Sequence, residues 1–242
     1  GIAAGYATNI PPHNISEIID AAVYRIHFPT CSLEELEEKV QGPDFPTGGI
    51  VQGTDGIHEA FLSGKGRVVI RAKTTLHETR TINQIVITEI PYEVVKVNMV
   101  KKIDEIRLNM NLDGLLDVRD ESDRNGLRIV LDIKKEAYAQ LILNYLYKNT
   151  DLQVYYNYNM IAIVDQRPVL LGLREMLDAF IKHRKEVVLR RSRFQYDDLE
   201  KRCHILEGLM RAVSVLDEVI TIIRSSKDKA DAKSNLMKRC LL

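Results

Sequence analysis

Proline and glycine are distributed very unevenly along the 242 residues. All seven prolines lie at or before Pro168, and eleven of the thirteen glycines lie at or before Gly126. Because both residue types interrupt helices and mark turns, the first two thirds of the chain is predicted to consist of short elements joined by turns. Between Leu173 and Arg224 there is no proline and one glycine, Gly208. We expect a nearly uninterrupted helix there, which at about 1.5 Å per residue would reach on the order of 75 Å.

Helices and strands alternate in the first part without the regular period of βαβ units. Apolar residues that recur every three or four positions predict helices over 15–27, 32–40, 57–62, 93–109 and 136–148. Runs rich in β-branched residues predict one strand that starts at residue 50 and five further strands, over 66–73, 84–90, 114–118, 127–133 and 152–164. We expect 66–73 to pair with 84–90, and 114–118 with 127–133. The mixture predicts an α+β fold with a mainly antiparallel sheet and packed helices, rather than a doubly wound sheet.

The long helical segment carries an apolar seam. Its members recur at spacings of three and four residues: Leu199, Cys203, Leu206, Met210, Val213, Leu216, Ile220 and Ile223. This spacing is typical of a coiled coil or a helix pair. One hypothesis is therefore a structural protein whose seam recruits a partner.

The charges balance, with 34 Lys and Arg against 34 Asp and Glu. Neutrality argues against a histone-like polycation, but local patches decide whether a chain binds DNA. No apolar run approaches a membrane span, no leader pattern is present, and three separated cysteines favour a reducing, cytoplasmic compartment. The first residue is not Met, so we expect a piece of a longer chain.

Signs of catalysis are weak. The six histidines are scattered, and none shares a metal-ligand spacing with a cysteine or carboxylate, so we expect no metal site. Adjacent carboxylates such as Asp197 and Asp198 point in different directions on a helix, which favours a solvated face over acid–base chemistry. Gly64-Lys65-Gly66 is too short for a phosphate loop and is interpreted as a turn.

Basic clusters are more informative. One cluster of five cations spans sixteen residues with Glu78 as its single acid: Lys65, Arg67, Arg71, Lys73 and Arg80. A second cluster of six spans twelve residues with Glu186 as its single acid: Lys182, Arg184, Lys185, Arg190, Arg191 and Arg193. Such clusters neutralise phosphates in DNA-binding proteins, and the alternative is a solvated face that pairs with acids elsewhere.

Two further segments leave alternatives open. The strand over 152–164 places Tyr156 and Tyr158 on one face and Tyr155 on the other. The tyrosines of 155–158 could stack on bases, although a half-buried strand also explains them. The run over 119–124, Arg-Asp-Glu-Ser-Asp-Arg, is dense in charge for a hairpin loop. It predicts either an internal ion-pair network or a contact to a partner.

Several long motifs resemble one family in the expected order. They are the first fourteen residues (Gly-Ile-Ala-Ala-Gly-Tyr-Ala-Thr-Asn-Ile-Pro-Pro-His-Asn), the turn over 42–48, Glu-Ile-Pro-Tyr at 89–92, the charged run at 119–124, and His-Ile-Leu-Glu-Gly-Leu at 204–209. The chain resembles bacterial type IIA topoisomerase A subunits over nearly its whole length. Residues 150–160, which contain Tyr-Tyr-Asn-Tyr-Asn-Met, favour topoisomerase IV over gyrase.

The resemblance implies a domain organisation and an activity. Residues 1–172 would form a tower domain, with 1–14 as the link from a winged-helix domain, and 173–242 a helical coiled-coil arm cut before the exit-gate dimer interface. The intact enzyme would relax and decatenate DNA by passing one duplex through a transient double-strand break held by a tyrosine. That tyrosine would lie before Gly1, so we expect this chain to hold no catalytic residue and to be inactive alone. The alternatives are the same region of gyrase and a non-catalytic DNA-binding scaffold.

The resemblance also implies partners and site residues. The partners would be double-stranded DNA and the B subunit, in an A2B2 tetramer, with no membrane. Mg and ATP would be used by the B subunit, with no cofactor in this chain, and the enzyme would be cytoplasmic and nucleoid-associated. Ile2 would be the side chain that wedges between base pairs and bends the duplex. With the first basic cluster, the DNA-binding residues would be Ile2, Lys65, Arg67, Arg71 and Lys73.

The chain departs from the family at two places. Val95-Lys96 follows Pro-Tyr-Glu-Val where Asn-Lys is usual, and 238–242 stands where the family continues toward its exit gate. The second departure makes us expect no stable dimer of this chain alone.

Overall fold

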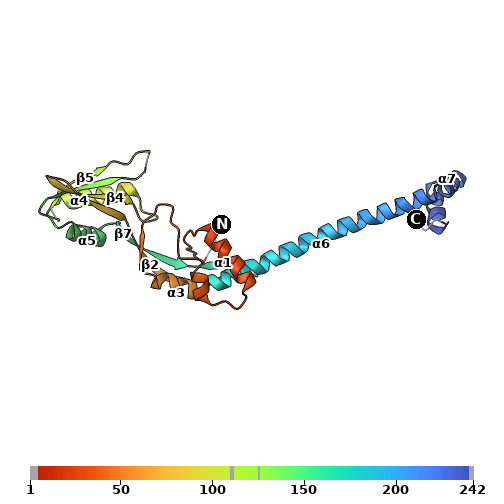
Figure 1. Ribbon diagram of the computed structural model, residues 1–242, viewed down its shortest axis with the longest axis horizontal. Coiled ribbons are helices and arrows are strands. Elements are labelled where there is room, and N and C mark those ends of the chain that lie inside the picture. Colours follow the sequence, from red (N-terminus) through yellow and green to blue (C-terminus); the bar gives the residue numbers. More distant parts are fainter. Residues whose placement is uncertain (1–4, 110–111, 125, 240–242) are drawn as a thin grey trace. The chain divides into compact units, whose positions relative to one another are not determined.

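The computed structural model describes residues 5–109, 112–124 and 126–239. It divides into two units, Gly1–Ile181 and Lys182–Leu242 (Figure 1). The first unit mixes antiparallel sheets with packed helices and the second is helical, which confirms the α+β prediction. The predicted domain boundary at 172/173 stays a prediction.

The first sheet contains β1 (Ile50–Gln52), β2 (Lys65–Arg71) and β7 (Gln153–Asn159) in the order β1-β2-β7, all antiparallel. One face of this sheet packs against α1 (Ile15–His27), α2 (Leu33–Glu37), α3 (Asp55–Ser63) and the start of α6 (Leu173–Ser214). The core between them includes Leu36, Phe61, Ile70, Tyr156 and Leu173. The face of the three-stranded sheet that the helices cover is therefore its apolar face.

The second sheet has the order β3-β4-β6-β5. Its strands are β3 (Lys73–Glu78), β4 (Ile82–Glu89), β5 (Leu115–Asp120) and β6 (Ile129–Lys134). Residues of α4 (Lys96–Leu108) and α5 (Ala139–Asn149) share a core with this sheet, and Figure 1 shows both helices on the same side of it. Met99, Ile103, Leu131 and Leu146 are fully buried in that core.

The expected pairing of 114–118 with 127–133 is confirmed by the antiparallel β5–β6 pair. The expected pairing of 66–73 with 84–90 is wrong. β2 pairs with β1 and β7, whereas β4 pairs with β3 and β6. The chain crosses between the sheets at buried Ala72, whose N–H donates to Leu152 O at 2.8 Å. A run that appears continuous in sequence therefore supplies strands to two sheets.

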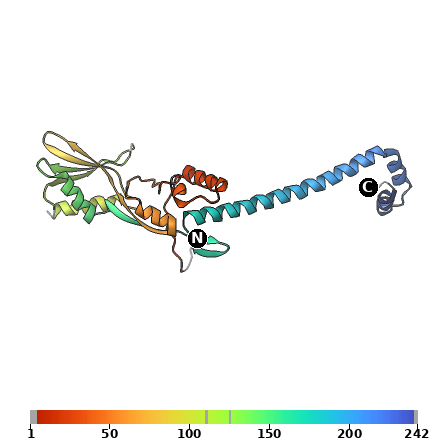
Figure 2. The same ribbon diagram turned by 60° about the horizontal axis from the view of Figure 1, so that its bottom comes forward.

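The single strand expected over 152–164 is two strands. β7 ends at Asn159, and β8 (Ile161–Val164) pairs with β9 (Arg167–Leu170) in a separate hairpin (Figure 2). The break lies at Met160, whose N–H donates to Gly64 O instead of a strand partner. The two-residue turn places Asp165 and Gln166 at positive φ (48° and 66°), the backbone that tight hairpins favour.

The predicted helix over 15–27 is confirmed with the same bounds, capped by the Asn14 side chain. Ala21 is its only fully buried residue in the described structure. Ile18 and Ala22 are partly buried against the core, while Ile15 is 73% and Val23 is 47% exposed.

The long helix expected to run to Arg224 ends earlier. α6 closes at Ser214, and α7 (Leu216–Ser225) and α8 (Lys229–Arg239) follow. Val215 has non-helical dihedrals (φ −123°, ψ 37°), and the Ser214 hydroxyl donates to Arg211 O at 2.8 Å. Such a side-chain bond competes with the backbone ladder near a β-branched residue. The 42 residues of α6 span about 63 Å.

Candidate nucleic-acid interface

The three-stranded sheet has a polar face opposite its core. Strand alternation buries Val68 and Ile70 of β2, so that Lys65, Arg67 and Arg71 lie on the other face. The β2–β7 register adds residues of β7 to that face, where Arg67 lies opposite Asn157 and Val69 opposite Tyr155. We call this surface the polar sheet face and define it by these residues: Gln52, Lys65, Arg67, Arg71, Gln153, Tyr155 and Asn157.

Glycines let α3 approach the back of β2. A Cβ on Gly66 would lie 2.3 Å from Gly56 O, and one on Gly56 would lie 2.0 Å from Arg67 O. Gly64 ends α3 in the left-handed conformation with φ 79°, as glycine does at helix C-termini. The interpretation of 64–66 as a turn is right for Gly64 and wrong for Lys65 and Gly66, which are the first two residues of β2 and pair with β7. The turn leads directly into the strand that carries Lys65 and Arg67.

Aromatic and amide groups hold the arginines of this face. The Arg67 guanidinium lies 3.5 Å from the centre of the Tyr155 ring, and Tyr155 is 54% exposed. Arg71 donates from Nε to Gln153 Oε1 (2.5 Å) and from a terminal nitrogen to Gln52 Oε1 (3.3 Å). In the described residues, no carboxylate lies within 4.0 Å of the charged groups of Lys65, Arg67 or Arg71. Arg67 and Arg71 are therefore oriented without being neutralised.

The structure does not bring every predicted site residue to this face. Lys73 begins β3 in the other sheet, and its Nζ lies 2.9 Å from Glu89 Oε1. The Gly49 N–H and then the Lys73 ammonium lower the pKa of Glu89, which keeps this partner of Lys73 ionised. Arg80 lies between β3 and β4. Ile2, predicted as the wedge, lies outside the described residues.

The N-terminal segment pairs with the edge of β7, which was not predicted from the sequence. Asn9 and Asn159 exchange both backbone hydrogen bonds, at 2.9 and 2.8 Å. The Asn9 amide also donates to Asn157 O (2.7 Å), and Tyr156 donates its hydroxyl proton to Asn9 Oδ1 (2.8 Å). Alternating asparagines in β7 were visible in the sequence, but their partner 148 residues away was not. These bonds fix the segment at the edge of β7.

The charged run at 119–124 begins an internal network, and this interpretation of it is confirmed for Arg119, Asp120 and Glu121. Arg119 contacts three carboxylates: Asp117 at 3.2 Å, Glu121 at 3.2 Å, and the buried Asp132. Arg128 binds Glu121 at 3.0 Å, and Lys96 binds Asp120 at 2.7 Å. The Lys96 ammonium, followed by the Ser122 hydroxyl, lowers the pKa of Asp120 to about 2.

The described residues offer little for catalysis. They contain no group of three or more His, Cys, Asp or Glu side chains that could hold a metal ion. Burial raises the pKa of the Tyr158 and Tyr156 hydroxyls, which disfavours their ionisation to a nucleophilic phenolate. None of the helices in the described part of the chain is both long enough and apolar enough to span a bilayer.

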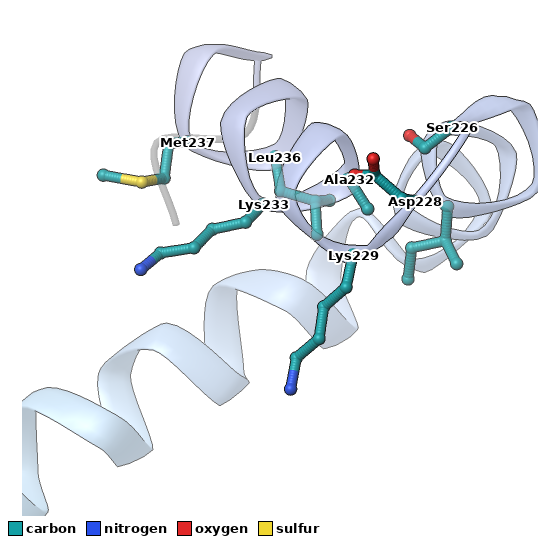
Figure 3. A pocket seen from close by; sticks show the side chains of 8 residues that line it. Ser226, Asp228, Lys229, Ala232, Lys233, Leu236 and Met237 are labelled. Atoms are coloured by element: carbon teal, nitrogen blue, oxygen red, sulfur yellow. The ribbon is translucent and has the colours of Figure 1, made fainter.

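The second unit has a pocket between α7 and α8. Its volume is about 780 Å³, and Figure 3 shows the lining side chains, which combine apolar Leu236 and Met237 with Lys229 and Lys233. Asp228 caps α8 by accepting from the Asp231 N–H at 2.8 Å. The pocket brings together no catalytic pair of side chains.

Comparison with known proteins identifies relatives of this chain. The family model that describes the A subunits of DNA gyrase and topoisomerase IV matches residues 1–242. The chain is 57% identical over 238 residues to the A subunit of DNA topoisomerase 4 from Bacillus subtilis (strain 168), a match that covers 98% of this chain and 30% of the relative. The corresponding proteins of Streptococcus pyogenes serotype M3 and Staphylococcus epidermidis are 57% identical over 237 residues and 52% identical over 238, each match covering 98% of the chain.

This chain spans about 30% of the length of the curated relatives it matches. The family model covers every residue, and the motifs that carry the resemblance lie within that match. The chain belongs to the family of DNA gyrase and topoisomerase IV A subunits.

Proposed function

We propose that this chain is the DNA-binding and DNA-bending part, with a helical arm, of a topoisomerase IV A subunit. The relatives named above are all A subunits of DNA topoisomerase 4, which favours topoisomerase IV over gyrase. The intact enzyme would pass one duplex through a transient double-strand break in another. In it, two A and two B subunits would act together in the cytoplasm on the nucleoid, and the B subunits would use Mg and ATP.

The polar sheet face is the observation that carries the DNA-binding proposal. It presents three cations without carboxylate partners in the described structure, on a rigid three-stranded sheet. Lys and Arg side chains bind DNA mainly through phosphates, and the guanidinium fork suits phosphate oxygens. The Tyr155 ring and the Asn157 amide would add a stacking surface and hydrogen bonds beside them. Lys73, paired with Glu89, would contribute less than Arg67.

A wedge at Ile2 would be tied to β7 by the residues that follow it. Ile2 lies five positions before Ala7, whose carbonyl accepts from the Asn159 amide at 2.7 Å. Five residues of extended chain reach at most about 18 Å. A wedge at Ile2 and phosphate contacts on the polar sheet face would therefore act on one stretch of duplex, which is the combination that bends DNA.

Salt titration of duplex binding tests the proposal. The slope of log K against log salt is negative, and its magnitude decreases by about 0.9 for each phosphate contact removed. A lower slope here means a smaller magnitude. We expect the double variant Lys65→Gln/Arg67→Gln to lower the slope by nearly two. The matched control is Lys101→Gln/Lys134→Gln, which removes two cations that already pair with Glu105 (4.0 Å) and Asp113 (2.7 Å). An unchanged slope in the first variant, or an equal fall in both, would contradict the proposal.

Cleavage assays test the wider assignment. With Mg and the B subunit, we expect no protein-linked breaks from residues 1–242 and such breaks from a chain extended through the winged-helix domain and the exit gate. Breaks formed by residues 1–242 alone would place a nucleophile among the tyrosines of this chain.

A further inference from the structure

A twelve-residue segment of α6 concentrates positive charge. Residues 182–193, here the basic arm segment, contain six cations and one acid, Glu186. All six cations are exposed on the helix: Lys182, Arg184, Lys185, Arg190, Arg191 and Arg193. In a chain with equal numbers of acids and cations, a net charge of five within about three helical turns is a local concentration of positive charge that attracts anions.

The described structure supplies little counter-charge. No carboxylate among the described residues lies within 4.0 Å of the charged groups of Arg184, Lys185, Arg190, Arg191 or Arg193.

The next cations of α6 have a different setting, because residues 197–202 hold three acids and two cations. Asp197 precedes Lys201 by four residues and Asp198 precedes Arg202 by four, the favourable order for pairs along a helix. Neither pair comes within 4.0 Å in the described structure, so the two segments differ in their local balance of charge and not in ion pairs. The basic arm segment holds six cations and a single acid, Glu186. The charge density that attracts an anion is therefore confined to 182–193.

The apolar seam shows which cations stay accessible. The seam residues of α6 are exposed in the described structure, with Leu199 at 61% and Met210 at 73%, so a partner helix could cover them. Each residue of an α-helix turns by about 100° around its axis. Arg190 lies nine positions before Leu199, so it lies about 180° around the helix from the seam. Arg193, six positions before Leu199, lies about 120° away. A helix that covers the seam would leave both arginines in solvent.

We propose that the basic arm segment is a second phosphate-binding surface for duplex DNA, separate from the polar sheet face. This inference rests on the proposed function, because it takes DNA as the ligand of the chain. Twelve helical residues extend about 18 Å, and duplex DNA carries a phosphate for every ~1.7 Å of its axis, so several phosphates lie within reach. Four of the six cations are arginines, whose planar fork binds phosphate oxygens in pairs. The contact would not depend on sequence, because phosphates carry no base information.

The test compares two double variants in one helix. Arg190→Gln/Arg193→Gln removes the cations opposite the seam, and Lys201→Gln/Arg202→Gln removes the next two, which lie among three acids. Glutamine keeps nearly the same helix propensity, so both variants keep α6. Duplex binding is titrated with salt in each variant, both in the wild-type background and in the Lys65→Gln/Arg67→Gln background. The second background removes cations of the polar sheet face, so the two surfaces are measured separately.

We expect Arg190→Gln/Arg193→Gln to lower the salt slope by one to two in either background, at about 0.9 per phosphate, and the control pair to leave it within about 0.3. An unchanged slope, or an equal fall in the control, would overturn the inference. Retained DNA binding with lost association of the B subunit would overturn it as well, because the segment would then be a protein contact. If Lys65→Gln/Arg67→Gln left the salt slope unchanged while Arg190→Gln/Arg193→Gln lowered it, the proposed role of the polar sheet face would be contradicted and this inference would be supported.

Discussion

Two arginine-containing surfaces of the first unit look alike in sequence and differ in their contacts. Arg67 of β2 lies over the Tyr155 ring with no carboxylate within 4.0 Å in the described structure, whereas Arg119 of β5 contacts Asp117, Glu121 and Asp132. Both side chains project from antiparallel sheets. The diagonal neighbour on the paired strand makes the difference. Arg67 pairs with Asn157 and has Tyr155 as its diagonal neighbour, while Arg119 pairs with Val130 and has buried Asp132 as its diagonal neighbour. An arginine held by aromatic and amide groups can still bind a phosphate, and one held by three carboxylates stabilises the fold.

The largest effect is expected where the backbone supports the polar sheet face. Gly66→Ala would place a Cβ 2.3 Å from Gly56 O and 2.8 Å from the Ala60 N. Because both atoms belong to the backbone, β2 and α3 must separate, and we expect the free energy of unfolding to fall by about 2–4 kcal/mol. Urea denaturation measures this change. The control Gly208→Ala, with open space around its Cβ, should instead stabilise α6 slightly, and equal losses would contradict the close-packing argument.

The second prediction concerns the arginine of the ion-pair network. Arg119→Ala leaves Asp132, which is 7% exposed, with Gln84 Nε2 at 2.8 Å as its remaining side-chain partner in the described structure. We expect unfolding to become easier by about 2 kcal/mol, because a nearly buried carboxylate loses a charged partner. DNA affinity should not change. A denaturation midpoint equal to wild type would show that this network does not stabilise the fold.

The third prediction concerns Arg67 of the polar sheet face, for which we expect a small loss of stability and a clear loss of DNA affinity. Arg67→Ala removes the contact with Tyr155, which at an exposed site costs about 0.5–1 kcal/mol of stability. Duplex affinity at low salt should fall several-fold. Fluorescence anisotropy and denaturation, measured on the same samples, separate the two effects. If Arg67→Ala lost stability as Arg119→Ala does while it kept DNA affinity, the contrast between the surfaces would disappear.

The smallest effect is a dependence on pH within the network. The Lys96 ammonium and Ser122 hold the pKa of Asp120 at about 2, below the ordinary 3.8. A lowered folded-state pKa contributes stability above pH 3.8, and this contribution is lost as the pH falls through 2. Asp120 is partly exposed, so solvent limits the contribution to less than about 1 kcal/mol. Asp120→Asn should therefore be less stable than wild type at about pH 6, with the difference gone near pH 2; a difference that persists there would exclude ionisation as its cause.

Local signals allowed much of the fold to be predicted. Asn14 caps α1 where the apolar spacing begins, and Gly64 ends α3, so both bounds follow from residues next to the helix ends. Alternation in β7 correctly placed Tyr156 and Tyr158 on one face and Tyr155 on the other, and the structure buries the first two. These features depend on backbone propensity and on the period of the strand, which a sequence displays directly.

Non-local features could not be predicted in this way. The β-rich runs at 66–73 and 84–90 have matching composition, but β2 pairs with β7, about 90 residues away, through contacts that leave no local signal. The helix break at Val215 arises from a serine hydroxyl and a β-branched residue within an otherwise helical sequence. For the candidate site, the cations were visible, but only the register revealed that Arg67 has an aromatic neighbour and Lys73 an acidic one.

Site-specific photo-crosslinking tests the central claim, that the polar sheet face contacts duplex DNA. A photoreactive amino acid would replace Asn157 on that face and, as the comparison, Leu76, which is 48% exposed on β3 of the other sheet. The account predicts a protein–DNA crosslink from position 157 that salt suppresses and a much weaker one from position 76. Equal crosslinking from both positions, or crosslinking from position 76 alone, would contradict it.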